Sequence, residues 1–180
     1  RWVDADLQWA KQLAEVLLEH FEDPQAGGFY FTADDHEPLI QRPRPLMDEA
    51  TPSGNGIAAQ CLQRLGYLLG EPRYLEAVQR CLRAGAQALH ELPQAHASLL
   101  TALEEHQQPA ESVVLRGEPE ALAPWRARIQ RHYAPRRMSF VIPPGARLPE
   151  ALAAKQATPA PVAYICQGST CSAPLTDPAE

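Results

Sequence analysis

The chain has 180 residues, of which 45% are hydrophobic, and its formal net charge at neutral pH is −6. This composition is sufficient to build a buried core, and no apolar run approaches the length of a transmembrane helix. No long basic stripe is visible, and Arg136–Arg137 stands as an isolated basic pair. The charge balance therefore argues against nucleic acid or an anionic membrane as a partner.

The N-terminus and the cysteines bear on the cellular context. The first turn contains Asp4 and Asp6 instead of a basic region and an apolar block, so no signal peptide is expected. Arg1 lies in a segment that already has helical spacing, and we expect a fragment of a longer protein. Four scattered cysteines are too few for a secreted disulfide framework, which favours a reducing, cytoplasmic location.

Residues 1–108 are predicted to form antiparallel helical hairpins. Apolar residues recur at helical spacing over residues 3–21, which predicts one amphipathic helix ending near Glu22. Residues 27–32 look extended instead, and residues 39–42 are expected to pair with them as a β-ribbon.

Two further helices are expected around a very short link. Gly70 fits a left-handed C-terminal position and Pro72 fits the first turn of the next helix, so the two helices must lie antiparallel. The helix before the link is expected to begin at a Ser53 cap and to bury Ile57, Cys61, Leu62, Leu65, Leu68 and Leu69. The helix after the link is expected to bury Tyr74, Leu75, Val78, Cys81, Leu82 and Leu89, and a fourth helix begins after Pro93.

Residues 109–180 are predicted to form a small α/β tail. The apolar run at 113–115 is typical of a strand buried on both faces, and strands are also expected at 140–142 and 162–165. A helix beginning at Pro119 should place Leu122, Trp125, Ile129 and Tyr133 on one side, and a short helix is expected around 149–155. Strand, helix and strand in this order predict a parallel pair with a crossover helix. The fold class is therefore mainly α with a short β-α-β unit.

The acidic turn before the second expected helix is the best candidate site. Asp48 and Glu49 could act as acid and base or bind sugar hydroxyls, while Ser53 and Asn55 orient the ligand. The neighbouring Arg42 favours a polar cleft. The alternative is that Ser53 only caps the helix while Asp48 and Glu49 are solvated. No catalytic residue, metal ligand set or cofactor motif is assigned.

Two other motifs leave alternatives open. The aromatics of Gly27-Gly28-Phe29-Tyr30 could stack on a sugar or fill the core behind a glycine turn. Cys166 and Cys171 are redox candidates, but their four-residue spacing does not fit a thioredoxin-type motif and no zinc-ligand pair accompanies them. They are expected to form a loop disulfide or to remain two free thiols. Cys61 and Cys81 are expected in the core.

Four motifs in order resemble one family: Gly27-Gly28-Phe29-Tyr30, Leu39-Ile40-x-Arg42, Asp48-x-Ala50-x-Pro52-Ser53-Gly54-Asn55 and Cys166-x4-Cys171-x2-Pro174. The family is that of the thioredoxin-domain-containing proteins related to spermatogenesis-associated protein 20 and bacterial YyaL. The resemblance implies a thioredoxin-like N-terminal domain, absent here, and an α/α-toroid similar to six-hairpin glycosidases and N-acylglucosamine 2-epimerases. This chain would be the C-terminal portion, with the last hairpins of a partial toroid.

The resemblance also implies a function by fold analogy. In such toroids the cleft lies at one mouth, and Arg42, Asp48, Glu49 and Asn55 are expected to line it. We therefore expect a carbohydrate-active or carbohydrate-binding toroid without a complete active site in this piece, and whether it is an enzyme stays open. The alternative is an interaction or scaffold module for the absent thioredoxin-like domain. Expected partners are the missing N-terminal part, a saccharide, and a second copy through an exposed apolar flank.

Overall fold

The computed structural model describes residues 2–37 and 39–179, which divide into two compact units. Within these described residues, the helical unit comprises residues 8–67 and 71–107. The second unit contains a four-stranded sheet and comprises residues 2–7, 68–70 and 108–179. The architecture is thus mainly helical with a small α/β tail, as the sequence predicts.

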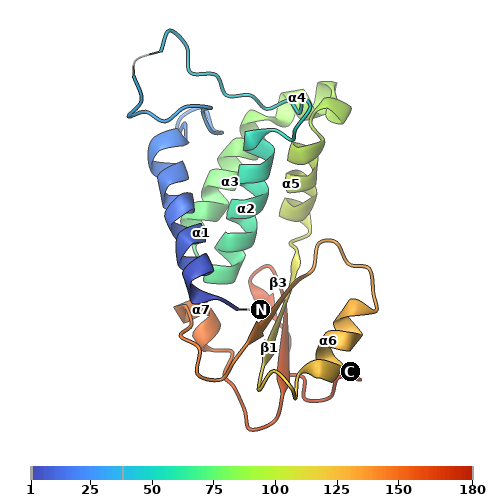
Figure 1. Cartoon of the computed structure of the whole chain (residues 1–180). Coiled ribbons are helices and arrows are strands. Elements are labelled where there is room, and N and C mark those ends of the chain that lie inside the picture. The colour runs from blue at the N-terminus through green and yellow to red at the C-terminus, as the bar shows by residue number, and fades with distance from the viewer. Residues whose placement is uncertain (1, 38, 180) are drawn as a thin grey trace. The chain divides into compact units, whose positions relative to one another are not determined.

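The first helix runs as one continuous rod, although its last turn is wider than an α-helical turn. None of the described helices combines the length and apolar character needed to cross a membrane. The helical elements are α1 (Asp4–Val16), the π-helical turn η1 (Leu17–Phe21), α2 (Gly54–Leu69), α3 (Pro72–Ala84), α4 (Ala86–Glu91), the 3-10 turn η2 (Pro93–Ala95) and α5 (Ala97–Gln107) (Figure 1). The predicted end of the first helix near Glu22 is confirmed.

Helices α2 and α3 form the predicted antiparallel hairpin. Gly70 has a φ of +67°, the left-handed conformation expected of a residue that ends a helix before a tight link. Near the link, a Cβ added at Gly66 would lie 2.9 Å from a methyl carbon of Leu75, so the two helices approach closely there. At the far end, the Sγ of Cys81 lies 3.6 Å from the Oδ1 of Asn55. The start of one helix therefore lies beside the end of the other.

Helices α2 and α5 run parallel and approach closely. A Cβ at Gly56 would overlap the Ser98 side chain, so only glycine fits this contact. One turn further along, the amide of Gln60 donates to the Ser98 carbonyl at 2.8 Å. Two turns further, the Arg64 guanidinium pairs with Glu105, whose side chain is fully buried. The contacts advance in the same direction on both helices.

Helices α1 and α3 also run parallel. The Tyr74 hydroxyl donates to the Glu15 carboxylate at 2.6 Å, and two turns later Arg80 Nε donates to Glu22 at 2.8 Å. Burial of the ring, together with the hydrogen bond to Glu15, raises the pKa of Tyr74 above its usual range. Two pairs of parallel helices, α1 with α3 and α2 with α5, therefore join through the antiparallel α2–α3 hairpin.

The predicted apolar face of α2 is partly wrong. Ile57 is 43% exposed and Cys61 is also exposed, whereas the predicted Leu62 is buried with Ala58 and Ala59. The small residues are the ones that allow close approach to the neighbouring helices, so they and not Ile57 face the core. On α1, exposed apolar side chains recur at helical spacing at Trp9, Leu13 and Val16.

The predicted β-ribbon between α1 and α2 is wrong. In the described part of this connection, residues 27–32 and 39–42 form no strand. One isolated bridge joins Glu22 to Phe29, and the amide of Phe31 donates to the Pro43 carbonyl at 2.9 Å. Proline has no N–H to donate, so Pro43 and the nearby Pro45 cannot continue a ladder.

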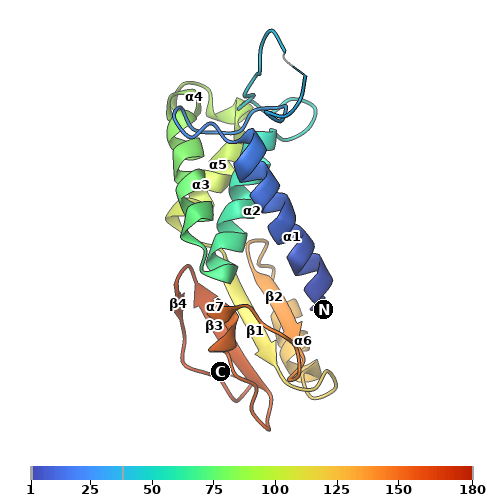
Figure 2. The ribbon, with the colours of Figure 1, turned by 90° about the vertical axis from the view of Figure 1, so that its left-hand side faces the viewer.

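The α/β unit contains a sheet of order β2-β1-β3-β4 (Figure 2). The predicted parallel pair with a crossover helix is confirmed, because β1 and β2 pair in parallel and α6 connects them. The third strand pairs antiparallel with β1, and β4 completes a hairpin with it. The elements are β1 (Glu111–Arg116), α6 (Ala123–Gln130), β2 (Met138–Ile142), α7 (Glu150–Ala153), β3 (Val162–Gln167) and β4 (Thr170–Cys171).

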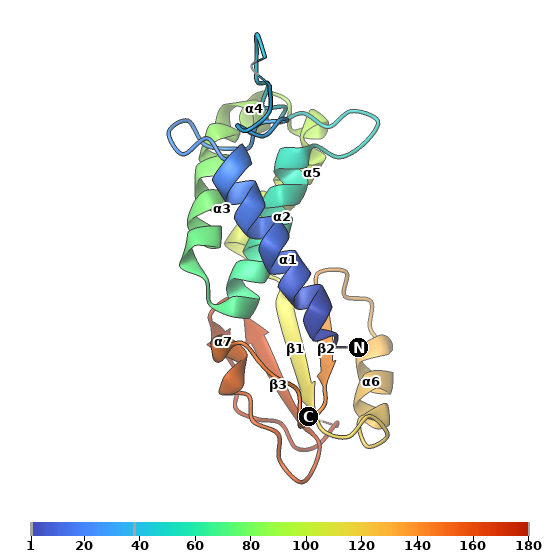
Figure 3. The same ribbon diagram turned by 60° about the vertical axis from the view of Figure 1, so that its left-hand side comes forward.

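Helix α6 covers one face of this sheet (Figure 3). Leu122 and Trp125 pack there on a cluster formed by Val113, Leu115 and Ala163 of the central strands. Tyr133 does not join them: α6 ends at Gln130, and the Tyr133 side chain is 93% exposed. The prediction that Tyr133 lies on the same side of this helix as Leu122 and Trp125 is therefore wrong.

Candidate functional site

Asp48 ties together the starts of two helices. Its carboxylate accepts hydrogen bonds from the amide of Ser53 at 2.8 Å, and from both the amide and the hydroxyl of Ser98. Burial alone would raise the pKa of Asp48, but the hydrogen bonds from Ser98 and from the Ser53 amide outweigh it and lower the pKa below the usual value. The carboxylate is thus held ionised between α2 and α5.

Ser53 and Asn55 complete this N-terminal region of α2. The Ser53 hydroxyl accepts a hydrogen bond from the Gly56 amide at 3.0 Å, which confirms the predicted cap. The Asn55 side chain is almost fully buried, and its amide both accepts from and donates to backbone groups, as a peptide group does in a β-sheet. It accepts from the Phe29 amide at 2.6 Å and donates to the carbonyls of Phe29 and Pro45, both at 2.9 Å.

The backbone conformation and close packing explain why glycine occupies the two positions before the aromatic residues. Gly27 and Gly28 have φ values of +79° and +83°, which favour glycine strongly. A Cβ at Gly27 would overlap the Arg80 carbonyl, and a Cβ at Gly28 would lie 2.9 Å from the Asn55 Oδ1. The glycines therefore bring the backbone of Phe29 within reach of Asn55.

Arg42 and Arg44 brace the loop from the other side. The Arg42 guanidinium lies 4.2 Å above the centre of the Tyr30 ring and donates to the carbonyls of His20 and Thr32. Arg44 donates to the Gly27 carbonyl and lies 5.5 Å from the same ring. These contacts satisfy backbone carbonyls that an irregular loop would otherwise leave unpaired.

A cleft of about 410 Å³ opens beside this braced loop. Its apolar wall includes Phe31, which is 73% exposed, and Met47, which is 48% exposed. Glu49 lies in the lining with an exposed carboxylate that has no hydrogen-bond or ion-pair partner among the described residues. The full lining is Leu17, Phe29, Tyr30, Phe31, Pro45, Met47, Glu49, Thr51, Pro52, Ser53, Gly54 and Asn55.

The five predicted ligand-binding residues have different surroundings in the structure. Glu49, Ser53 and Asn55 line the cleft, whereas Arg42 and Asp48 are not among its lining residues. The Ser53 and Asn55 side chains are engaged in hydrogen bonds within the protein, to backbone groups and to the side chains of Ser98 and Cys81. Glu49 is therefore the acidic lining side chain open to a ligand. Sequence reasoning missed Phe31 and Met47, because an exposed apolar residue in a loop has no periodic pattern that distinguishes it.

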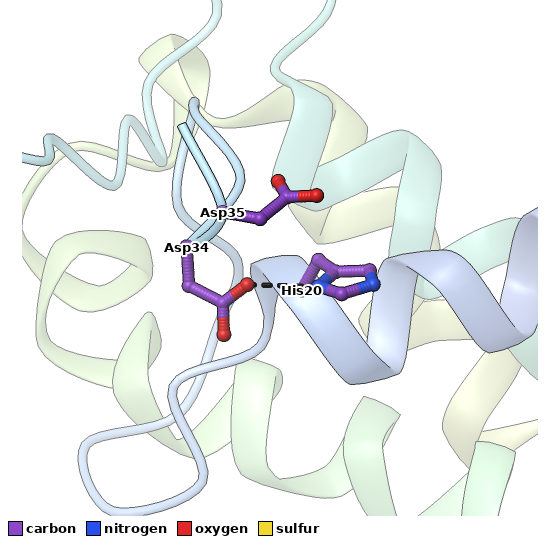
Figure 4. Close-up of side chains that lie close together, drawn as sticks. All are labelled: His20, Asp34 and Asp35. Atoms are coloured by element: carbon purple, nitrogen blue, oxygen red, sulfur yellow. Dashed lines mark hydrogen bonds and ion pairs between the residues drawn. The ribbon is translucent and has the colours of Figure 1, made fainter. Parts of the chain in front are cut away.

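A second polar cluster was not predicted as a unit. His20, at the π-helical turn, lies with Asp34 and Asp35, and their ligand-capable atoms all fall within 4.8 Å of one another (Figure 4). The Nδ1 of His20 lies 2.8 Å from the Oδ1 of Asp34. This hydrogen bond raises the pKa of His20 and lowers the pKa of Asp34. The cluster faces solvent, and the hydrogen bond between His20 and Asp34 fastens the loop to η1.

The cysteines fall into three environments. Cys166 and Cys171 face each other across the β3–β4 hairpin and form a disulfide, one of the two predicted alternatives. Cys81 is fully buried as predicted, and desolvation raises the pKa of its thiol to about 12. Cys61 is exposed, so its predicted place in the core is wrong.

No family model matches the chain. It is 27% identical to human spermatogenesis-associated protein 20 over 97% of its own length, and 26% identical to the mouse protein over the same share. This similarity supports a relationship to the spermatogenesis-associated protein 20 family. An uncharacterised protein of Caenorhabditis elegans is 26% identical over 96% of the chain. The chain spans 23% of the length of the human and mouse proteins and 24% of the nematode protein.

Proposed function

We propose that the cleft beside the N-terminus of α2 binds a saccharide. The observation that carries this proposal is the juxtaposition of an exposed aromatic side chain, Phe31, with the unpartnered carboxylate of Glu49 in one cleft of about 410 Å³. A sugar ring presents an apolar face, which an aromatic ring can cover, and hydroxyl groups, which a carboxylate accepts as hydrogen-bond donors. The volume lies within the range of small-molecule sites.

The proposed activity is binding without hydrolysis by this chain alone. Glycoside hydrolysis generally requires two carboxyl groups on either side of the scissile bond. Among the described residues that line the cleft, Glu49 is the carboxylate, and Asp48 is held by three hydrogen bonds to the helix starts. A complete toroid would supply the opposite wall of the cleft from residues beyond this chain, in line with the parallel helix pairs.

The test is a titration of the chain with maltose, cellobiose and N,N′-diacetylchitobiose. Binding is measured by isothermal titration calorimetry and by NMR chemical-shift changes. We expect one of these disaccharides to bind, and Phe31→Ala and Glu49→Gln each to weaken it about threefold to tenfold. Tyr133→Ala removes another exposed aromatic far along the chain and serves as the matched control. Binding that neither cleft variant weakens, or no binding by any of the three, would refute the proposal.

A second candidate is an interaction module within the longer protein. It rests on the apolar stripe of Trp9, Leu13 and Val16, whose exposed fractions are 63%, 53% and 46%. These residues occupy positions i, i+4 and i+7 of one helix, which is the spacing of a helix face that packs against a neighbour. The occupant we propose is the part of the same protein that precedes this segment, including its thioredoxin-like domain.

This second candidate is tested by expressing the preceding region of the same protein and measuring its capture by the chain. Trp9→Glu should abolish capture and also any self-association seen by analytical ultracentrifugation. Arg83→Glu, on an exposed position of α3, is the control charge change. Retained capture by the Trp9 variant would show that α1 is not the contact surface.

A further inference from the structure

The α6 region has a charge opposite to that of the whole chain. Residues 121–149 contain six arginines and no aspartate or glutamate, although the formal net charge of the chain is −6. The pair Arg136–Arg137, which looks isolated in the sequence, is therefore part of a basic cluster with Arg126, Arg128 and Arg131. Such a cluster creates a local positive potential on an otherwise acidic protein.

A groove within the α/β unit has two arginines of this cluster, Arg128 and Arg137, in its lining. Its cavity volume is about 200 Å³. The floor is apolar and is formed by Val113, Leu115, Trp125, Ala163 and Ile165. The rim carries Arg128, His132 and Arg137, and the C-terminal segment closes one side with Leu175 and Pro178.

The cations at the groove exceed the carboxylates. Arg137 Nε pairs with Glu111, the acidic residue of the lining. Arg128 donates to the carbonyl of Ala179 at 3.1 Å, which is a neutral partner, and it has no ion pair among the described residues. Arg131 is exposed and has no hydrogen-bond or ion-pair partner among the described residues.

These features select the chemistry of the occupant. A cavity of about 200 Å³ is smaller than the ~300–1,000 Å³ typical of small-molecule sites, but it is large enough for one buried side chain. An apolar floor offers no hydrogen-bond donor or cation to a phosphate backbone, whereas burial against it stabilises a leucine or phenylalanine side chain. The surrounding arginines favour carboxylates on either side of that anchor.

We propose that α6 and the groove beneath it bind an acidic peptide segment of a partner protein, with one apolar side chain of the segment seated in the groove. The affinity arises from the anchor in the groove, and the arginines provide the selection for acidic neighbours and faster association. Because the charge part of the interaction is exposed, it weakens as salt is added.

The probe is a fluorescein-labelled peptide with a central leucine–phenylalanine pair between two blocks of alternating glutamate and aspartate. Its binding to the whole chain is measured by fluorescence anisotropy at 50 and 200 mM salt. Two matched peptides separate the contribution of the apolar anchor to binding from that of the acidic residues. One carries serine in place of the apolar pair, and the other carries glutamine and asparagine in place of the acids. A single-stranded oligonucleotide and phosphatidylserine vesicles are tested as competitors.

We expect the first peptide to bind and each matched peptide to bind at least tenfold more weakly. Arg131→Gln and Arg128→Gln should each weaken binding about threefold to tenfold, whereas Arg83→Gln, the same change at an exposed position of α3, should not. Circular dichroism checks that the variants are folded, and the Arg131 side chain has no hydrogen-bond or ion-pair partner to lose in the described part of the chain. The proposal would be overturned if the first peptide did not bind, or if the serine peptide bound as tightly as the first. Equal effects of Arg83→Gln and Arg131→Gln would also overturn it. So would displacement of the labelled peptide by the oligonucleotide or the vesicles at concentrations lower than those of the unlabelled peptide that displace it.

Discussion

The carboxylate of Asp48 accepts two hydrogen bonds from Ser98, a residue fifty positions further along the chain. Through a third hydrogen bond from the Ser53 amide, the same carboxylate caps the start of α2. One side chain therefore fixes the connection before α2 to the start of α5. Met47 and Glu49, the two sequence neighbours of Asp48, both line the proposed cleft.

Asp48→Asn should destabilise the fold by about 2 kcal/mol at pH 7, because it replaces a charged acceptor with an amide that offers one acceptor atom. The folded-state pKa of Asp48 is lowered below its ordinary value of 3.8. The contribution of the ionised carboxylate to the stability of the fold is therefore complete well above pH 3.8, and it is lost as the pH falls through the lowered pKa. Urea unfolding of both proteins at pH 7 and pH 3 measures this, with Asp6→Asn as the control. A difference in the free energy of unfolding between the two proteins that is larger at pH 3 than at pH 7 would contradict this role of the Asp48 carboxylate.

Asn55→Ala should cost about 3 kcal/mol or more, because it leaves the buried N–H and carbonyl of Phe29 without partners. Gly28→Ala should cost about 1–2 kcal/mol from its left-handed backbone, and more from the clash with the Asn55 side chain. In the double variant that clash disappears, so the double loss should be smaller than the sum of the single losses. Additive losses in chemical denaturation would show that the two positions do not interact.

Arg116→Met should leave the stability unchanged or raise it by about 1 kcal/mol. Arg116 is only 4% exposed, and its Nε and Nη1 atoms have no hydrogen-bond partner among the described residues, although Nη2 donates to the Pro144 carbonyl at 3.1 Å. Desolvation lowers the pKa of Arg116, which is the sign that burial disfavours the charge. Thermal unfolding compares this variant with Arg126→Met at an exposed position. A large loss of stability would mean that the guanidinium holds a partner such as a bound anion.

Thiol labelling should distinguish the three cysteine environments. Without reductant, the folded chain should react at Cys61 and the unfolded chain at Cys61 and Cys81, while reductant should expose all four thiols. Removing the disulfide by Cys171→Ser should cost about 2 kcal/mol, because the bond closes a short loop with a sequence separation of 5. Cys61→Ser is the control. Four reactive thiols in the unreduced, unfolded chain would exclude the disulfide.

Local signals in the sequence were sufficient for the regular elements. Ser53, Gly70 and Pro72 mark helix ends by capping and backbone conformation, and the run at 113–115 has the pattern of a buried strand. These features depend on neighbours a few residues away, and hence can be predicted. The parallel pairing of β1 and β2 follows from the crossover rule.

The contacts that shape the cleft could not be predicted in the same way. The pairing of Asp48 with Ser98 and the stacking of Arg42 on Tyr30 depend on tertiary packing of separate segments. The predicted ribbon failed because arginine side chains and Asn55, rather than a second strand, satisfy the carbonyls of this connection. Periodicity identified an apolar face on α2, but it could not show that Ile57 would remain exposed.

The missing side chain at Gly56 has an effect beyond its own position. Because α2 and α5 touch at this residue, their separation is set by a hydrogen atom rather than by a methyl group. Enlarging residue 56 would push the two helix starts apart and pull Ser98 out of reach of Asp48. A substitution inside the helix pair would thereby reshape the proposed cleft, although residue 56 is not one of its lining residues.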